Sequence, residues 1–141
     1  MIDKITLAYA IALVAHKGQT DKVGVDYIKH PLTVSKNCNT EQEKIVALLH
    51  DVLEDTKVTK EDLLLFFDEE IVEAVCLLTH DERDSYMDYL SRIKNNETAR
   101  NVKIQDLKHN MDLSRFPDGP SKYDLERNEK KYKPALEFLL K

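Results

Sequence analysis

The segment that most constrains this chain runs from residue 45 to residue 56 and reads IVALLHDVLEDT. It places His50, Asp51, Glu54 and Asp55 at the end of a strongly apolar run that predicts a core helix. Burying a carboxylate costs several kcal/mol unless it is paired, hydrogen-bonded or bound to a metal ion. On one helix, His50 and Glu54 lie one turn apart, as do Asp51 and Asp55. The simplest account is a core helix that carries a metal-and-water site at its C-terminal end.

The length and composition favour one helical domain. The chain has 141 residues, enough to bury a core, so we expect residues 1–141 to form a single domain. Only three Gly and four Pro interrupt it, and no segment alternates apolar and polar residues as a half-buried strand does. We therefore predict an all-α fold of the helical-bundle type.

The charge and the cysteines limit the classes of partner. A formal net charge of −5 argues against a protein that coats a nucleic acid polymer, but it allows one small polyanionic ligand held by a metal ion and local lysines. Cys38 and Cys76 are too far apart for a disulfide framework, and we expect both to be reduced in a cytoplasmic protein. No stretch is long enough to cross a membrane, and the apolar run 5–15 predicts a buried helix rather than a signal peptide.

Apolar spacing and capping signals give the expected helices. Thr40 and Glu43 have the spacing of a capping box, and Pro31 is suited to the first position of a helix, which leaves His30 at its entrance. A turn is expected at residues 116–120 and a kink near Pro134. The predicted helical segments are 2–17, 31–38, 40–56, 59–67, 68–78, 85–94, 97–116 and the segment that begins at residue 121.

A metal site needs more ligands than His50 and Asp51. An imidazole nitrogen beside a carboxylate suits a first-row divalent ion such as Mn, Fe or Zn better than Ca. Two protein ligands are seldom enough, so the fold must bring others to the site. The candidates are His30 and Asp106, and Asn110 lies one helical turn beyond Asp106. From spacing alone, an ordinary solvated side chain remains the competing interpretation for His30 and for Asp106.

Four strings, in order and spacing, carry a resemblance to a known family. They are AHKGQ at 15–19, YIKHP at 27–31, ALLHDVLEDT at 47–56 and VKIQDLKHN at 102–110. Over about residues 5–116 the chain resembles the HD-family hydrolase domain of the RelA/SpoT alarmone enzymes and their small single-domain relatives. The resemblance implies an all-helical phosphohydrolase, usually with Mn²⁺, that removes the 3′-pyrophosphate from guanosine tetra- or pentaphosphate.

The same resemblance implies a role for individual side chains. It implies that the metal ligands are His30, His50, Asp51 and Asp106. Glu54 and Asp55 match the family's catalytic acidic pair. Asn110 would help to hold the nucleotide. A bound divalent ion lowers the pKa of its water and neutralises phosphoryl charge, and the acidic pair is placed to orient or deprotonate that water. The competing interpretation of the pair is solvation at a helix end.

Positive charge for the phosphates would come from lysines near these motifs. The candidates are Lys22, Lys29, Lys103 and Lys108, although each has ordinary solvation as its competing interpretation. Lys22 is the one that we assign to substrate binding. The remaining histidines receive no part in the chemistry: we interpret His16 as structural and His80 and His109 as incidental.

The sequence departs from the family pattern at the position before Lys22. The family carries an Arg that contacts the nucleotide base where this chain has Asp21, and a Pro where it has Asp26. An Asp cannot stack on or donate to a guanine as an Arg does. Two alternatives therefore stay open: hydrolysis of another phosphorylated nucleotide, and a module that binds a nucleotide without hydrolysing it. Retention of both Glu54 and Asp55 favours hydrolysis, and a chain of this length leaves no room for a synthetase domain.

Overall fold

The computed structural model describes residues 2–141, and every regular element in that range is a helix. An isolated bridge between Thr20 and Asp26 is the only β-type pairing among these residues. The all-α prediction is confirmed. The elements are α1 (Lys4–Ala15), α2 (Lys29–Lys36), α3 (Glu41–Leu49), α4 (Val52–Asp55), α5 (Lys60–Leu64), α6 (Glu69–Leu77), α7 (Tyr86–Lys94), α8 (Glu97–Asn110), the 3₁₀ turn η1 (Leu113–Arg115), α9 (Lys122–Arg127), the π-helical turn η2 (Asn128–Tyr132) and α10 (Lys133–Leu140).

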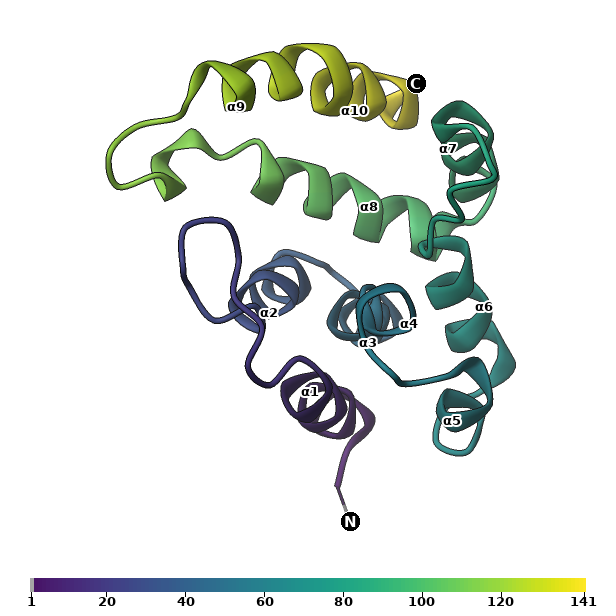
Figure 1. The fold of residues 1–141 in the computed structure, drawn as a ribbon. Coiled ribbons are helices and arrows are strands. Elements are labelled where there is room, and N and C mark those ends of the chain that lie inside the picture. Colours follow the sequence, from purple (N-terminus) through teal and green to yellow (C-terminus); the bar gives the residue numbers. More distant parts are fainter. Residues whose placement is uncertain (1) are drawn as a thin grey trace.

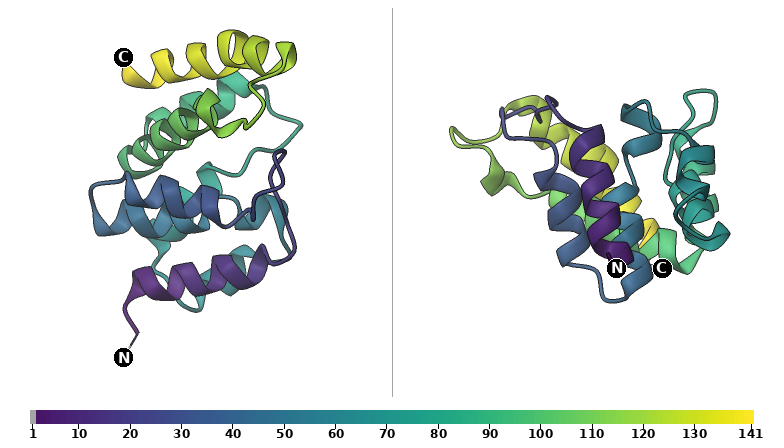
Figure 2. Two further views of the ribbon diagram at one scale, coloured as in Figure 1. Left: turned by 90° about the vertical axis from the view of Figure 1, so that its left-hand side faces the viewer. Right: turned by 90° about the horizontal axis from the view of Figure 1, so that it is seen from below.

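Helix α8 crosses the middle of the molecule and contacts α2, α3, α6, α7 and α10 (Figure 1). The left view of Figure 2 shows the C-terminal helices, α8, the α2–α3 pair and α1 as successive layers. Helix α3 is packed by α1, α2, α6 and α8, so each residue from 45 to 49 is at most 2% exposed. The apolar run that opened the sequence analysis is therefore the centre of the core, and its C-terminal end faces α8.

Polar side chains fix where most helices begin. Each of these N-cap residues accepts the backbone N–H of the residue three positions later, which is worth about 1 kcal/mol. They are Asp3, Thr40, Thr59, Asp68, Ser85, Asn96 and Ser121. The capping box predicted at Thr40 is half formed, because the Glu43 carboxylate accepts the N–H of Asn39 (3.1 Å) instead of the N–H of Thr40.

The helix predicted over residues 40–56 is interrupted at its most polar point. Helix α3 ends at Leu49, α4 begins at Val52, and His50 and Asp51 form the turn between them. The carbonyl of Ala47 accepts both the N–H of His50, only three residues later, and the Nδ1–H of the His50 ring. Side-chain competition for a backbone acceptor disrupts the regular helical bonding. His50 and Asp51 thus leave the regular helix, contrary to the prediction of one continuous element.

Three other boundaries differ from the predictions. Helix α2 begins at Lys29, so His30 lies in its first turn and Pro31 at the third position, where a missing N–H is tolerated because first-turn N–H groups have no intrahelical acceptor. Helix α5 ends at Leu64 and α8 ends at Asn110, each several residues before the predicted end.

The kink predicted near Pro134 takes the form of a widened turn. The N–H of Lys133 reaches the carbonyl of Asn128, five residues back, across η2. Proline lacks an N–H and its ring crowds the carbonyl four residues earlier, which explains why the helix widens just before it. Within residues 2–141, none of the helices combines the length and the apolar character needed to cross a bilayer.

The packing predicts a matched pair of stability effects on α5 and the turn after it. Leu63 is 1% exposed and Leu65 is 77% exposed. We expect Leu63→Ala to lower the free energy of unfolding by about 2–5 kcal/mol, because it leaves a cavity in the core. Leu65→Ala should change it by less than about 0.5 kcal/mol. Urea denaturation followed by circular dichroism measures both, and equal losses would contradict the described burial.

Candidate metal centre and active site

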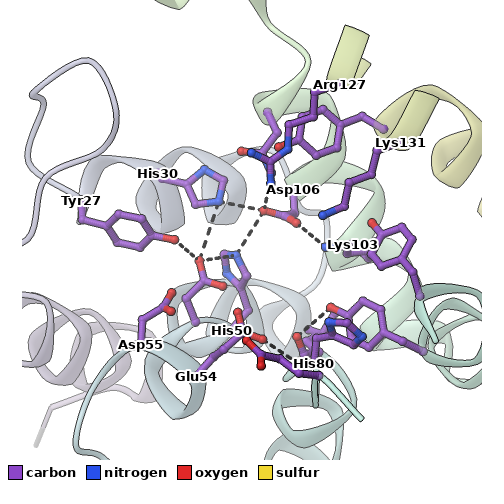
Figure 3. Close-up of a pocket in the computed structure, with 17 residues that line it drawn as sticks. Tyr27, His30, His50, Glu54, Asp55, His80, Lys103, Asp106, Arg127 and Lys131 are labelled. Atoms are coloured by element: carbon purple, nitrogen blue, oxygen red, sulfur yellow. Dashed lines mark hydrogen bonds and ion pairs between the residues drawn. The ribbon is translucent and has the colours of Figure 1, made fainter. Parts of the chain in front are cut away.

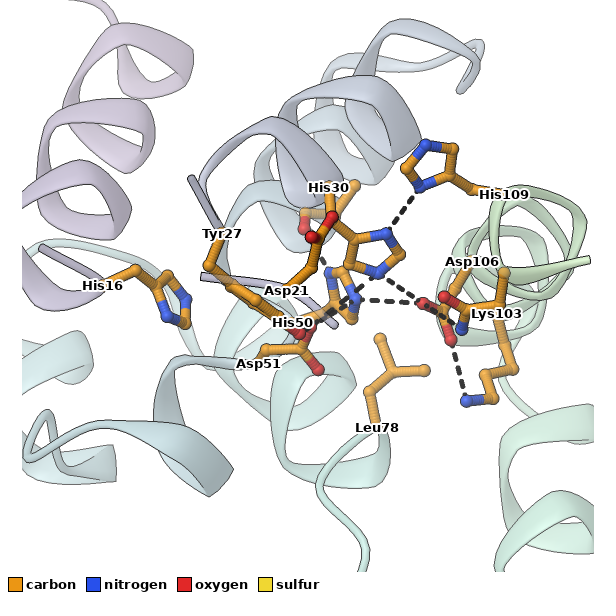
Figure 4. Close-up of polar contacts among 12 residues, drawn as sticks. His16, Asp21, Tyr27, His30, His50, Asp51, Leu78, Lys103, Asp106 and His109 are labelled. Carbon is orange, nitrogen blue, oxygen red and sulfur yellow. Dashed lines mark hydrogen bonds and ion pairs between the residues drawn. The ribbon is translucent and has the colours of Figure 1, made fainter. Parts of the chain in front are cut away.

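Four of the predicted site residues converge from three parts of the chain. His30 comes from α2, His50 and Asp51 from the turn between α3 and α4, and Asp106 from α8 (Figure 4). The Nε2 atom of His50 lies 3.0 Å from Asp51 Oδ2 and 3.3 Å from Asp106 Oδ1. The Nε2 atom of His30 lies 2.8 Å from Asp106 Oδ1 and 3.9 Å from Asp51 Oδ2. The four side chains therefore face one common centre.

The state of His50 tests whether this centre suits a cation. Its Nδ1–H donates to the carbonyl of Ala47 (2.5 Å), while its Nε2 is buried close to the carboxylates of Asp51 and Asp106 but is not aligned for a hydrogen bond to any group in residues 2–141. Once Nε2 has lost its proton, a histidine that is fixed by its other ring nitrogen in this way presents a lone pair to a metal. The ligand atoms of His30, His50 and Asp106 lie within 4.8 Å of one another. The donor set fits a divalent metal ion.

The electrostatics of the centre agree with a positive charge there. Burial lowers the pKa of His50, but the carboxylates of Asp51 and Asp106 outweigh burial and raise it well above its ordinary value. Burial raises the pKa of Asp51, yet the neighbouring His50 holds it at about 2. The pKa of Asp106 also lies well below its usual value, because Lys103 and the two histidines outweigh its burial. Both carboxylates are thus ionised and face the ring nitrogens.

Three further side chains hold the carboxylates in place. The hydroxyl of Tyr27 donates to Asp51 Oδ2 (2.5 Å), Lys103 Nζ donates to Asp106 Oδ2 (2.8 Å), and Asn110 Nδ2 donates to Asp106 Oδ1 at 3.4 Å. Burial, and then the charge of Asp51, raise the pKa of the Tyr27 phenol, so it remains a donor. Tyr27 received no role in the sequence analysis, although it lies three residues before His30.

The acidic pair from α4 lies beside this centre. Carboxylate oxygens of Asp51, Glu54 and Asp55 lie within 4.8 Å of one another. The N–H of His80 donates to Glu54 Oε1 (2.7 Å) and fixes one orientation of that carboxylate. Partial burial, and then the nearby negative charge of Asp51, raise the pKa of both Glu54 and Asp55, although the His80 contact lowers that of Glu54. Either carboxylate can therefore accept a proton more readily than an ordinary surface carboxylate.

These groups form one wall of a cavity of about 550 Å³, a volume within the usual range for a small-molecule site (Figure 3). Arg127 and Lys131 also line the cavity, across from Glu54 and Asp55 in Figure 3, while Lys103 lines it beside Asp106. Arg127 and Lys131 come from α9 and η2, which the sequence analysis left without a role. The cavity thus offers a cation-binding centre and an acidic pair on one side, and an anion-binding side opposite.

The two predicted substrate contacts fall in different places. Asn110 lines the cavity. Lys22 does not line it, since its Nζ pairs with Asp124 Oδ1 at 3.0 Å and lies over the Phe116 ring. The Asp21 carboxylate is also occupied. Its Oδ1 accepts the N–H groups of Val23 and Val25, and its Oδ2 accepts a hydrogen bond from Arg115 in η1.

The remaining histidines differ in their surroundings. His16 is buried, its Nδ1 contacts Gln19 Oε1 at 2.9 Å, and its Nε2 makes no hydrogen bond within residues 2–141, so its structural role stays a prediction. His80 lines the cavity and orients Glu54 through its backbone. His109 lies against His30, with their Nδ1 atoms 2.7 Å apart. Both residues therefore contact the residues of this site, His80 through its backbone N–H and His109 through its ring.

The fold matches that of a solved structure. A solved structure of a metazoan ortholog of SpoT, described as hydrolysing ppGpp, superposes with a TM-score of 0.75. The match covers 100% of this chain and 87% of that one, at 23% sequence identity, and therefore shows the fold alone. No protein-family model matches the sequence.

Curated relatives point to the same class of enzyme. The chain is 39% identical over 80 residues to the bifunctional (p)ppGpp synthase/hydrolase SpoT of Escherichia coli. It is 41% identical over 78 residues to the guanosine-3′,5′-bis(diphosphate) 3′-pyrophosphohydrolase of Vibrio cholerae, and 44% identical over 72 residues to that of Borreliella burgdorferi. These matches cover 48–52% of this chain but only 11% of each relative. They confirm the resemblance to the RelA/SpoT hydrolases.

The electrostatics of His50 predict that metal binding releases a proton. Since the folded, metal-free protein holds the pKa of His50 well above its ordinary value, the ring is protonated at neutral pH. That proton must leave before Nε2 can bind a metal, so we expect the dissociation constant for Mn²⁺ to fall as pH rises towards that raised pKa. Isothermal titration calorimetry in two buffers of different ionisation enthalpy should give about one proton released per ion. A pH-independent constant would contradict this assignment.

Proposed function

We propose that this chain is a metal-dependent phosphohydrolase that removes the 3′-pyrophosphate from guanosine tetra- or pentaphosphate, with Mn²⁺ as its metal. The observation that carries the proposal is the buried Nε2 of His50, which faces two ionised carboxylates at the edge of a cavity whose other wall is cationic. Similarity to curated alarmone pyrophosphohydrolases supports the choice of substrate.

His30, His50, Asp51 and Asp106 would hold the metal ion. A mixed set of two imidazoles and two carboxylates suits Mn²⁺ or another first-row ion better than Mg²⁺ or Ca²⁺, which favour oxygen ligands. When bound, such an ion lowers the pKa of a water ligand and neutralises charge on phosphoryl oxygens. Tyr27 and Lys103 donate to the two carboxylates and orient them.

Glu54 and Asp55 act on the water that attacks phosphorus. Their raised pKa values suit a general base, because a base must take up a proton during the reaction. The contact from the His80 N–H orients Glu54, and Asp55 lies beside it. The attacking oxygen forms a bond to the phosphorus attached to the ribose 3′-oxygen, whose bond to phosphorus breaks. The 3′-oxygen takes up a proton, which yields GDP or GTP and pyrophosphate.

Arg127 and Lys131 bind the phosphate groups. Among residues 2–141 neither cation is in an ion pair, whereas Lys103, which also lines the cavity, is already paired with Asp106. The Lys131 ammonium lies over the ring of Tyr86 and the Arg127 guanidinium over that of Tyr132. These aromatic contacts hold both cations over the cavity without neutralising them.

A specific observation favours a second substrate class. Asp21 replaces the arginine that contacts the base in the family, and its carboxylate is occupied by backbone N–H groups and an arginine. It therefore offers no stacking or donor group to a guanine. A phosphorylated nucleotide with a different base would meet the same metal centre, acidic pair and cationic wall.

One assay tests both candidates. Purified protein with Mn²⁺ is incubated with guanosine tetraphosphate, and with a panel of nucleotides that carry other bases or a 3′-monophosphate. GDP and pyrophosphate as products support the first candidate. Release of phosphate or pyrophosphate only from another nucleotide supports the second. Tight nucleotide binding with no product over hours would contradict both, and a chelator control establishes the need for metal.

A pair of variants separates metal binding from proton transfer. We expect Asp51→Ala to lose both metal and activity, since Asp51 faces His50 and His30. Glu54→Gln should retain metal and lose about 10²–10⁴-fold in kcat, because the amide cannot accept the proton. Elemental analysis and single-turnover kinetics measure the two properties. Equal metal loss in both variants would contradict this division of roles.

A second set of variants tests the cationic wall. We expect Arg127→Gln and Lys131→Gln each to raise KM for the nucleotide about tenfold or more, since each removes a charged contact to phosphate. Lys130→Gln is the matched control, because Lys130 is exposed in the same turn and does not line the cavity. Steady-state kinetics checks the set, and the same KM for all three variants would contradict the assignment.

A further inference from the structure

His30 and His109 form an unusual histidine pair at the back of the metal centre. Their Nδ1 atoms are 2.7 Å apart, their ring planes differ by 17°, and their centroids are 4.9 Å apart. The centroid separation exceeds the nitrogen separation by roughly the diameter of one imidazole ring. The rings therefore meet edge to edge in nearly one plane, and Figure 4 shows the contact leading away from Asp106. This is the geometry of an N–H···N hydrogen bond.

The direction of this bond follows from the other nitrogen of His30. Its Nε2 faces Asp106 Oδ1 at 2.8 Å, in the centre that we assign to the metal. A metal takes the lone pair of a neutral imidazole, so the ring proton of His30 must then lie on Nδ1. Only an acceptor can stand opposite that proton. The Nδ1 of His109 would be that acceptor, with its own proton on Nε2.

We propose that His109 is a positioning residue that accepts the Nδ1–H of His30 and thereby fixes the tautomer and the orientation of this metal ligand. The inference rests on the proposed metal centre. His109 does not line the cavity, so it has no contact with the substrate and acts through His30. Helical spacing brings it to the centre, because His109 lies three residues after Asp106 on α8.

A second pair of contacts holds the two histidines at this spacing. Arg115 Nη1 donates to the backbone carbonyl of His109 (3.1 Å), and Arg115 Nη2 donates to Asp21 Oδ2 (3.2 Å). Asp21 lies in the loop that leads into α2, the helix that carries His30. The residue that departs from the family pattern thus ties the loop before one histidine to the end of the helix that carries the other.

The test compares one substitution that retains a hydrogen-bond acceptor near this position with one that removes it. His109→Asn places an amide oxygen near the position of Nδ1, while His109→Phe keeps the size of the ring and removes the acceptor. We expect the Mn²⁺ dissociation constant of His109→Phe to rise about 10–100-fold, as is usual for partners of metal-ligating histidines. His109→Asn should stay close to the wild-type constant. Competition with a chelating dye measures metal affinity without any substrate.

A measurement on the unaltered protein guards against a variant that fails to fold. In ¹⁵N spectra of the Zn²⁺-loaded wild-type protein, the side chain of His30 should be the tautomer with its proton on Nδ1. A proton on Nε2, or unchanged Mn²⁺ affinity in a folded His109→Phe, would overturn the proposal. Loss of affinity in both variants would reject the acceptor role. A wild-type protein that binds no metal would instead overturn the proposed function, and the positioning role with it.

Discussion

The buried carboxylate of Asp106 is the constraint on which the rest of the site depends. It is 5% exposed, at the centre of the fold, and such a charge is tolerated only when paired and hydrogen-bonded. Its two oxygens face Lys103 from α8 itself, His30 from α2 and His50 from the turn between α3 and α4, so three parts of the chain meet at this carboxylate. The interruption between α3 and α4 lies at this meeting point, where the carbonyl of Ala47 fixes the His50 ring that faces Asp106.

The cavity separates two kinds of charge that would otherwise neutralise each other. Glu54 and Asp55 come from α4 on one wall, whereas Arg127 and Lys131 come from the C-terminal helices on the other. A phosphorylated ligand between them would meet cations at its oxygens and a base near the attacking water. The central helices supply only the acidic side of the cavity. The C-terminal helices, which lie over α8, supply Arg127 and Lys131 on its other side.

The sequence identified the parts that depend on local pattern. Helical periodicity and caps predicted most elements, and the His50–Asp51 pair was recognisable because charge in an apolar run needs a partner. The contact between His30 and Asp106 depends on tertiary packing, so spacing in the sequence could only identify them as candidates. Lys22 was chosen for its place beside a motif, yet packing pairs it with Asp124. His109 could have been found, since it lies three residues after Asp106 on a helix.

The π-helical turn η2 has a geometric consequence for the last helix. Four side chains follow one another at intervals of four residues along the C-terminal helices. Arg127 and Lys131 line the cavity, and Ala135 and Leu139 are buried. In a regular α-helix such a series spirals by about 40° per step, because a turn holds 3.6 residues. The π-helical turn holds more residues than an α-helical turn, so it reduces this angular displacement between the four side chains. One nearly straight stripe can therefore run along the C-terminal helices, with its cationic end at the cavity and its apolar end in the core, where α10 packs on α8.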